Sequence, residues 1–230
     1  MSLCRKHNIP WSSTRSLKSI IRRIDARLFP KNDRFAELLQ RCILPDCHSV
    51  LDVGCGDGAL HERVPGIPFT VGIDLKLSDK ARTAPYSEYR QVDVRSLADV
   101  FEPRQYDCAI AIDVIEHLTR DDGHRLLDAM EDIAVRRVII LTPNGFLSQP
   151  PAPDNPHQEH LSGWQAEDFF KRGYRVVGVR GWRPLRGMYA EIRWSPHFFW
   201  RRLSACTEAF TEKRPKLAFQ LLCIKDTSAA

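Results

Sequence analysis

The sequence predicts an α/β fold in which helices cover both faces of an open, doubly wound, mostly parallel sheet. Short apolar segments of strand type alternate with helical ones, which is the pattern of βαβ units. The first of these segments runs into a turn with glycines at alternate positions, Gly54, Gly56 and Gly58. A chain of 230 residues without internal repeats is long enough to bury one sizeable core. We therefore expect one α/β domain.

Seven segments have the short, apolar, turn-bounded pattern of buried strands. We expect strands over residues 50–53, 71–75, 89–94, 106–113, 137–145, 174–180 and 217–224. Helices are expected over residues 33–42, 59–63, 122–135 and 165–172. The last helix has a start signal, a capping box from Ser162 to Gln165, and a stop signal at Gly173.

The turn that contains the glycines, VLDVGCGDG at Val50–Gly58, indicates a cofactor site. Glycine accepts a positive φ and has no Cβ to keep a ligand away from the backbone. The helix that follows aims free N–H groups at the same place. The G-x-G-x-x-A spacing, with Asp74 beyond it, also fits a dinucleotide fingerprint. However, a carboxylate at Asp52 would repel a diphosphate, whereas it would attract the ammonium and sulfonium of S-adenosylmethionine.

This turn resembles the first motif of class I S-adenosylmethionine-dependent methyltransferases. Four later strand-like segments resemble further motifs of that family, in order and at plausible spacing, and the likeness covers residues 45–181. The resemblance implies a Rossmann-like sheet of seven strands, of which the last is antiparallel. It also implies that S-adenosylmethionine is the cofactor.

By this resemblance, acidic residues at successive strand ends bind successive parts of the cofactor. Asp52 attracts its cationic end, and Asp74 binds both ribose hydroxyls. Asp93 accepts from the adenine amino group, and Val94 contacts the ring. The cofactor-binding set that the resemblance implies is Asp52, Gly54, Cys55, Gly56, Gly58, Asp74, Leu75, Asp93, Val94 and Asp113. Each aspartate has a plain alternative as a turn former or helix cap, above all Asp113, which precedes a short helix over 114–118.

Cysteine usage indicates a reducing compartment. The seven cysteines form no CxxC pair, and no His/Cys cluster has the spacing of a zinc site, so we expect free thiols and no bound metal. No apolar run approaches the roughly 18 residues that span a bilayer, and no secretory signal is visible. We expect a cytoplasmic protein, with membrane contact limited to a peripheral one.

Charge is distributed unevenly, although the total is only +5. Residues 1–30 carry seven Lys or Arg and only one acid. Residues 31–230 are expected to form the catalytic domain. The first segment predicts a basic amphipathic helix, whose apolar stripe is Leu17, Ile20, Ile21, Ile24 and Leu28. Such a helix packs over the cofactor cleft, contacts an anionic membrane or a phosphorylated substrate, or belongs to a transit peptide. The modest charge and the lack of a visible RNA-binding module argue against a nucleic-acid partner.

A long loop over residues 145–164 follows the fifth strand and contains four prolines. Loops of this length are uncommon unless they act as lids or binding segments, and this one lies at the ligand-binding edge of the sheet. Methyl transfer from a sulfonium needs a base only if the acceptor must lose a proton, and histidine suits a hydroxyl acceptor. The candidate bases, in order, are His160, His157 and His117. Alternatively, these histidines only brace the loop.

Residues 182–216 form a basic C-terminal insertion relative to a minimal domain of this family. The segment carries an aromatic cluster beside two arginines, composed of Trp194, Phe198, Phe199 and Trp200. Either a helix packs these aromatics onto the sheet, or they form a hydrophobic acceptor wall or a membrane-interface contact. The second alternative favours a lipid-linked acceptor over a soluble metabolite or sugar.

The sequence thus predicts an S-adenosylmethionine-dependent methyltransferase that acts on a small molecule, by O-methylation of a metabolite, sugar or lipid-linked acceptor. Two alternatives stay open. One is an NAD-dependent oxidoreductase, and the other is a catalytically silent methyltransferase-like domain that serves as a binding partner. No motif specifies the acceptor atom or the oligomeric state.

Overall fold

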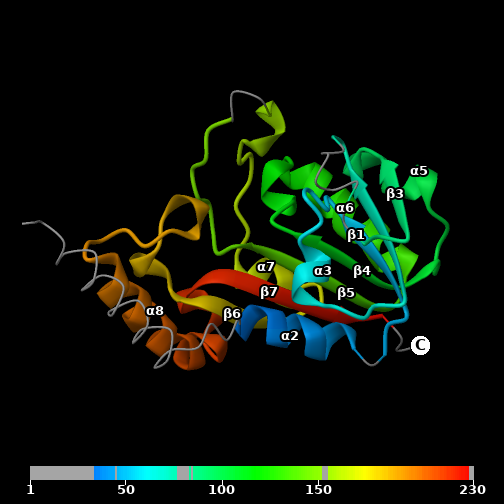
Figure 1. Cartoon of the computed structure of the whole chain (residues 1–230). Coiled ribbons are helices and arrows are strands. Elements are labelled where there is room, and N and C mark those ends of the chain that lie inside the picture. The colour runs from blue at the N-terminus through cyan, green and yellow to red at the C-terminus, as the bar shows by residue number, and fades with distance from the viewer. Residues whose placement is uncertain (1–33, 45, 77–82, 84, 152–154, 228–230) are drawn as a thin grey trace, which may run out of the picture.

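Seven strands form one mixed sheet at the centre of the computed structural model (Figure 1). The structure describes residues 34–44, 46–76, 83, 85–151 and 155–227. The strand order is β3-β2-β1-β4-β5-β7-β6, and β7 runs antiparallel to both of its neighbours while the other pairs are parallel. The predicted doubly wound sheet with an antiparallel last strand is therefore confirmed. The strands are β1 Ser49–Val53, β2 Phe69–Asp74, β3 Glu88–Gln91, β4 Tyr106–Ile112, β5 Ala134–Pro143, β6 Arg175–Trp182 and β7 Ala218–Asp226.

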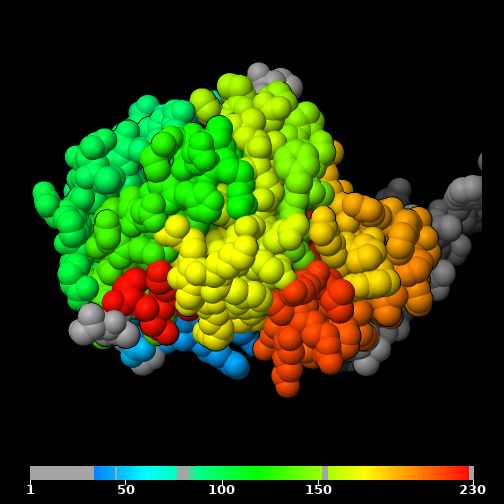
Figure 2. All heavy atoms as spheres, turned by 180° about the vertical axis from the view of Figure 1, so that it is seen from behind, coloured from blue at the N-terminus to red at the C-terminus, as the bar shows by residue number. Residues whose placement is uncertain are grey.

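Helices cover both faces of the sheet, and each face has its own hydrophobic core. On one face, α5, α6 and α7 pack against strand residues such as Leu51 and Val138; Figure 2 shows this side, with the yellow chain around α7 in the centre. On the other face, α2 and α3 pack against residues of opposite phase, such as Val50 and Ile139. Because successive strand residues point to opposite faces, strands covered on both sides are apolar almost throughout. The helices are α2 Arg34–Ile43, α3 Leu60–Arg63, α5 Leu97–Val100, α6 Arg120–Ile133, α7 Ala166–Phe170 and α8 His197–Glu212.

All the predicted strands and helices that fall on described residues are present, with shifts at their ends. β3 ends earlier than expected because Asp93 leaves the strand to cap the 3-10 turn η1, Val94–Ser96. α6 begins earlier, after its N-cap Thr119, and gives way directly to β5 at Ala134. Gly173, with a φ of +82°, follows α7 as the predicted stop. The other 3-10 turns are η2 Ile115–His117, η3 Pro156–Gln158, η4 Arg183–Leu185, η5 Met188–Ala190 and η6 Pro215–Leu217.

The capping box predicted from Ser162 to Gln165 is wrong. Gln165 is itself the N-cap of α7, and its backbone N–H donates to the Asp168 carboxylate at 2.8 Å. Ser162 is buried before the helix, where its hydroxyl donates to the Ile115 carbonyl at 3.3 Å and accepts from the Trp164 indole N–H at 2.9 Å. The Ser162 hydroxyl therefore links the loop to the turn after β4. Both hydrogen bonds satisfy a polar group that is buried away from water.

α8 packs along the edge strand β6 with a polar inner face. Ser204 and Thr211 are fully buried there, and a Cβ on Gly178 of β6 would lie 2.2 Å from the Thr211 carbonyl oxygen. The outer face of α8 is apolar instead, with side chains about half exposed: Phe198 (53%), Phe199 (51%) and Phe210 (49%). Of the two alternatives for this segment, packing of its aromatics onto the sheet is therefore wrong.

The basic amphipathic helix expected within residues 1–30 lies outside the described residues and stays a prediction. Across the part of the chain that is described, no helix is long and apolar enough to cross a membrane. Six cysteines fall in that part, and all of them are free thiols, as the sequence predicted.

Candidate functional site

The carboxyl ends of the parallel strands open into a cavity of about 460 Å³. Ligands bind at this edge of open α/β sheets, and the volume lies in the range of small-molecule sites. Most of the residues predicted from the sequence line this one space: Asp52, Gly54, Cys55, Gly56, Asp74, Leu75, Asp93, Val94, Asp113, His117 and His157. Two predicted residues, Gly58 and His160, do not line it.

The turn after β1 brings bare backbone to the cavity wall. Gly54 has a φ of +68°, and a Cβ at this position would lie 2.5 Å from Cγ2 of Val114. A side chain here would both strain the backbone and clash with the turn after β4. Gly56 has a φ of +51°, and its N–H donates to Oδ2 of Asp74 at 2.9 Å. Gly58, with a φ of +80°, completes the turn into α3 without reaching the cavity.

Asp74 ends β2 with its carboxylate held at the cavity. One oxygen accepts from the Gly56 N–H, and the other accepts from the Lys76 N–H at 3.0 Å. Since a carboxylate offers about four lone-pair positions, two acceptor positions remain after these bonds. The side chain is thus oriented by backbone donors and can still accept from a pair of hydroxyls.

Asp52 lines the same cavity, with only 3% of its surface exposed. Burial raises the pKa of its carboxyl to about 7, although the Tyr86 hydroxyl, which donates to it, and the nearby Arg63 act in the opposite direction. A carboxyl with so high a pKa lacks a full counter-charge. A ligand that brings a cation to Asp52 would stabilise its ionised form, which an ammonium or a sulfonium can do.

Two tyrosines outside the predicted cofactor-binding set, Tyr86 and Tyr89, support the glycine turn. Tyr86 donates to Asp52, and the Tyr89 hydroxyl donates to the Gly56 carbonyl at 2.9 Å and accepts from Sγ of Cys55 at 3.0 Å. The two tyrosine rings meet edge to face, 5.1 Å apart. Burial raises the pKa of the Cys55 thiol, so this residue stays protonated and acts as a small wall of the cavity. Tyr86 precedes the third strand and Tyr89 lies within it, and no motif marked either residue.

Asp93 combines the two roles that the sequence left open for it. Its carboxylate caps η1 by accepting from the Arg95 N–H at 2.9 Å, and it also lines the cavity beside Val94. The Arg95 guanidinium, 2.5 Å away, lowers the pKa of this carboxyl. The group is therefore an ionised acceptor at neutral pH, as a partner for an amino group should be.

Asp113 does not cap the turn that follows it, so the helix-cap alternative is wrong. η2 has Val114 at its N-cap position and no side-chain cap. The Asp113 carboxylate accepts instead from Nε2 of Gln220 on β7 at 2.6 Å, from a backbone with a φ of +54°. The residue thus links the end of β4 to β7 at the cavity.

The loop over residues 145–164 is fastened to η2. The N–H groups of Leu161 and Ser162 both donate to the Glu116 carbonyl, at 2.8 and 3.0 Å. This contact brings His160, whose surface is 8% exposed, next to His117, and the two rings lie 4.8 Å apart. His160, the first of the candidate bases, is therefore buried beside His117 and does not face the cavity.

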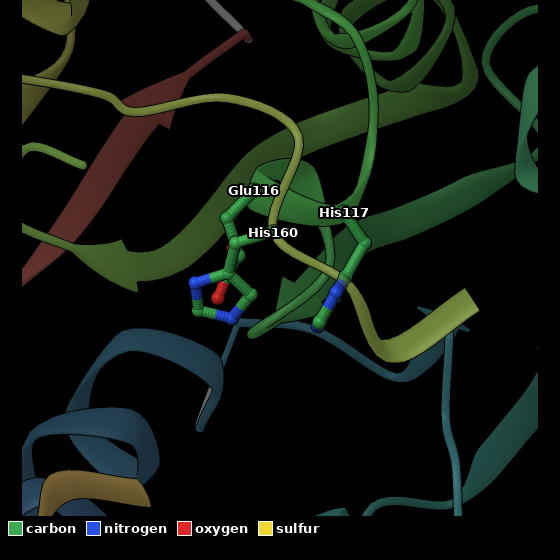
Figure 3. Close-up of side chains that lie close together, drawn as sticks. All are labelled: Glu116, His117 and His160. Atoms are coloured by element: carbon green, nitrogen blue, oxygen red, sulfur yellow. The ribbon is translucent and has the colours of Figure 1, made fainter. Parts of the chain in front are cut away.

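Glu116, His117 and His160 form a cluster of side chains that could bind a metal ion (Figure 3). Their nearest ligand atoms all lie within 4.8 Å of one another. Glu116 is 2% exposed; its Oε2 accepts from the Thr142 hydroxyl at 2.9 Å, and burial raises the pKa of its carboxyl. Burial likewise lowers the pKa of both histidines. No spacing in the sequence predicted this metal-binding cluster or Glu116 as one of its members, because the two histidines meet only when the loop folds back onto η2.

Several cavity residues carried no signal in the sequence. They come from α3 and from the loop, and the clearest of them are Arg63, Asn155, Gln158 and Leu161. The positions of the three loop residues depend on how the loop docks, and loop docking follows no fixed spacing.

A family model described as "Methyltransferase domain" matches residues 14–179 of the chain. No protein in the curated set matches the sequence.

Solved structures share the fold at low sequence identity. A SAM-dependent methyltransferase from Archaeoglobus fulgidus is 16% identical, with a TM-score of 0.50 over 90% of this chain and 99% of that one. The YcgJ protein from Bacillus subtilis is 13% identical, with a TM-score of 0.53 over 85% and 98% of the two chains. The [4+2]-cyclase SpnF is 16% identical, with a TM-score of 0.50 over 84% and 80%.

Proposed function

The chain belongs to the family of methyltransferase domains, and we propose that it methylates a hydroxyl oxygen of a small molecule. Its cofactor is S-adenosylmethionine. The observation that carries the proposal is the arrangement of three carboxylates, Asp52, Asp74 and Asp93, around one cavity of about 460 Å³.

Each carboxylate fits a different part of the cofactor. Asp52, buried and short of positive charge, would bind the cationic end. Asp74 keeps two acceptor positions for the ribose hydroxyls. Asp93, ionised beside Val94, would accept from the adenine amino group. These assignments place the sulfonium toward the turn after β4 and the histidines.

An NAD-dependent reaction is the less favoured alternative. A dinucleotide would bring a diphosphate to the glycine turn, where the carboxylate of Asp52 lies, and negative charge on this carboxylate would oppose it. The alternative of a catalytically silent domain also stays open, because a shared fold does not fix an activity. SpnF, which shares the fold, is described as a cyclase.

The chemistry asks mainly for positioning. The methyl group sits on a sulfonium, which is already an activated leaving group, and transfer is an in-line displacement. A hydroxyl acceptor must lose its proton to become a good nucleophile. His117 and His157 line the cavity, and we propose that one of them accepts this proton. His160 would act through its neighbour His117.

We also propose a peripheral contact with an anionic membrane surface, made by the outer face of α8. Phe199 and Phe210 are about half exposed on this face (51% and 49%), and Arg201 and Lys213 are exposed on the same helix and at its end. Exposed aromatic and basic side chains together favour the interface of an anionic bilayer. None of residues 182–216 lines the cavity, so the hydrophobic acceptor wall considered for this segment gains no support.

Calorimetric titration of the full chain tests the cofactor proposal. S-adenosylhomocysteine should bind to one site with a dissociation constant in the micromolar range, and NADH should give no heat. Binding of NADH without S-adenosylhomocysteine would support the oxidoreductase instead. Binding of S-adenosylhomocysteine without turnover on any panel of hydroxyl acceptors would support the silent domain.

A further inference from the structure

We propose that Glu116, His117 and His160 bind one divalent transition-metal cation beside the cofactor cavity. Two of these residues belong to η2 and the third to the loop that docks on it (Figure 3). The binding of the ion does not depend on the proposed function, whereas its role in the reaction does.

Both histidines are oriented as metal ligands are. Nδ1 of His160 lies 2.7 Å from the Leu147 carbonyl oxygen, and Nδ1 of His117 lies 3.0 Å from the Glu159 carbonyl oxygen. A carbonyl only accepts, so each Nδ1 carries the proton and each Nε2 keeps a free lone pair. Histidine ligands of metals commonly donate their second N–H to such a carbonyl, which fixes the ring and the tautomer.

Glu116 contributes a buried oxygen that has no hydrogen-bond partner among the described residues. Oε2 accepts from Thr142, but Oε1 has neither a partner nor contact with solvent. An unsatisfied carboxylate oxygen in a protein interior is costly, and a bound ion or water is one way to satisfy it. A cation between Oε1 and the two imidazoles would satisfy it.

The donor set indicates the kind of ion. Two imidazoles and one carboxylate suit Zn²⁺, Fe²⁺, Mn²⁺ or Co²⁺, whereas Mg²⁺ and Ca²⁺ prefer oxygen donors only. At a tetrahedral angle, two ligand atoms bound at about 2.1 Å lie about 3.4 Å apart. Because the ligand atoms here spread over up to 4.8 Å, the side chains would have to move together by up to about 1.4 Å on binding the ion.

Three protein ligands leave at least one position open, as in catalytic metal sites. His117 lines the cavity, so an ion bound to it would lie beside this space. On the proposed function, the ion would bind the acceptor hydroxyl and lower its pKa. With His117 bound to the ion, His117 has no lone pair left, so the hydroxyl proton would pass to His157 or water. The oxygen would then form a bond to the methyl carbon while the electron pair of the C–S bond returns to sulfur.

Metal binding is tested on the full chain after it has been stripped with a chelator. We expect about one equivalent of Co²⁺ to bind, with a visible absorption band of nitrogen and oxygen ligation and no thiolate charge-transfer band. Zn²⁺ should displace it and raise the melting temperature. Removing a ligand, as in Glu116→Gln, His117→Gln or His160→Gln, should weaken binding by about 100-fold or more.

The matched control is His48→Ala, because His48 is exposed at the opposite end of β1. This variant should bind Co²⁺ as the wild type does. Circular dichroism and S-adenosylhomocysteine affinity check that each variant is folded, and His117→Gln, at a half-buried position, is the mildest of them.

Either of two outcomes would overturn the proposal: a wild-type chain that binds no Co²⁺ or Zn²⁺, or folded ligand variants that bind the ion as tightly as the wild type. In that case the three side chains only stabilise the docked loop through their hydrogen bonds, with Glu116 in its neutral form. The two proposals fail separately, since S-adenosylhomocysteine binding without metal binding removes only this one, and metal binding without S-adenosylhomocysteine binding removes only the methyltransferase function.

Discussion

The cavity has two halves that are built differently. The half that we propose for the cofactor, the cofactor half, consists of strand ends and the turn after β1, where backbone donors hold carboxylates such as Asp74. The half that we propose for the acceptor, the acceptor half, consists of η2 and the loop that docks on it, where the N–H groups of Leu161 and Ser162 donate to the Glu116 carbonyl. The sheet fixes the cofactor half, and the docking of one loop fixes the acceptor half. Variants in the cofactor half should therefore change cofactor affinity, and variants in the acceptor half should change turnover.

The largest effect is expected in the cofactor half, from Gly54→Ala. The new Cβ would lie 2.5 Å from Val114 at a φ of +68°. We expect a loss of about 2 to 4 kcal/mol in unfolding free energy. Affinity for S-adenosylhomocysteine should fall beyond measurement, as calorimetry would show.

Gly66→Ala is the control for this variant, since Gly66 has a φ of +91° but nothing within 4 Å of its would-be Cβ. It should lose about 1 kcal/mol of stability and bind normally. The second change in Gly54→Ala/Val114→Ala should restore part of the affinity. If Gly54→Ala alone binds like the wild type, the backbone of this turn does not meet the cofactor.

Asp52→Asn tests the charge in the cofactor half rather than its shape. The amide keeps the volume and loses the attraction to a cation, so affinity for S-adenosylmethionine should fall by about 10- to 100-fold. Asp99→Asn, at an exposed position of α5, should leave the affinity unchanged. Equal affinities of the Asp52 and Asp99 variants would remove Asp52 from cofactor binding.

Substitution of the histidines should affect the acceptor half alone. We expect His117→Ala and His160→Ala to lower turnover by about 100-fold or more while cofactor affinity stays the same. The assay is formation of S-adenosylhomocysteine with a hydroxyl acceptor that the wild type methylates. His160→Ala is the sharper test, because this residue does not line the cavity and must act through His117. Unchanged turnover in His160→Ala would leave it only a bracing role.

The smallest effect is expected outside both halves, on α8. Phe199→Ser/Phe210→Ser should weaken binding to phosphatidylserine-containing vesicles by about 3- to 10-fold, since apolar burial and basic charge share the attraction. Phe170→Ser, at a 46% exposed position of α7, is the control and should bind normally. Vesicle sedimentation that ranks the two variants equally would argue against a role of α8 at membranes.

The same contrast explains what could be predicted from the sequence. The seven strands and the carboxylates at their ends follow from apolar runs and fixed spacing, because the ends of parallel strands meet at one edge. The sequence did not reveal Tyr86, whose hydroxyl binds Asp52 from outside any motif. Glu116 was missed since its neighbours in space depend on the loop. The polar inner face of α8 was missed because packing against Gly178 leaves no signal of periodicity.

The central claim is that Asp52 receives the positive end of the cofactor, and its pKa of about 7 offers the most direct test. Below this value the carboxyl must lose a proton before it can bind a cation, so affinity for S-adenosylmethionine should fall as the pH falls. Equilibrium binding of labelled S-adenosylmethionine should weaken on the order of 20-fold between pH 7.5 and 5.5 in the wild type. In Asp52→Asn the affinity should be low and nearly constant over this range. A wild-type affinity that does not change with pH, or a variant that keeps the full dependence, would contradict the account.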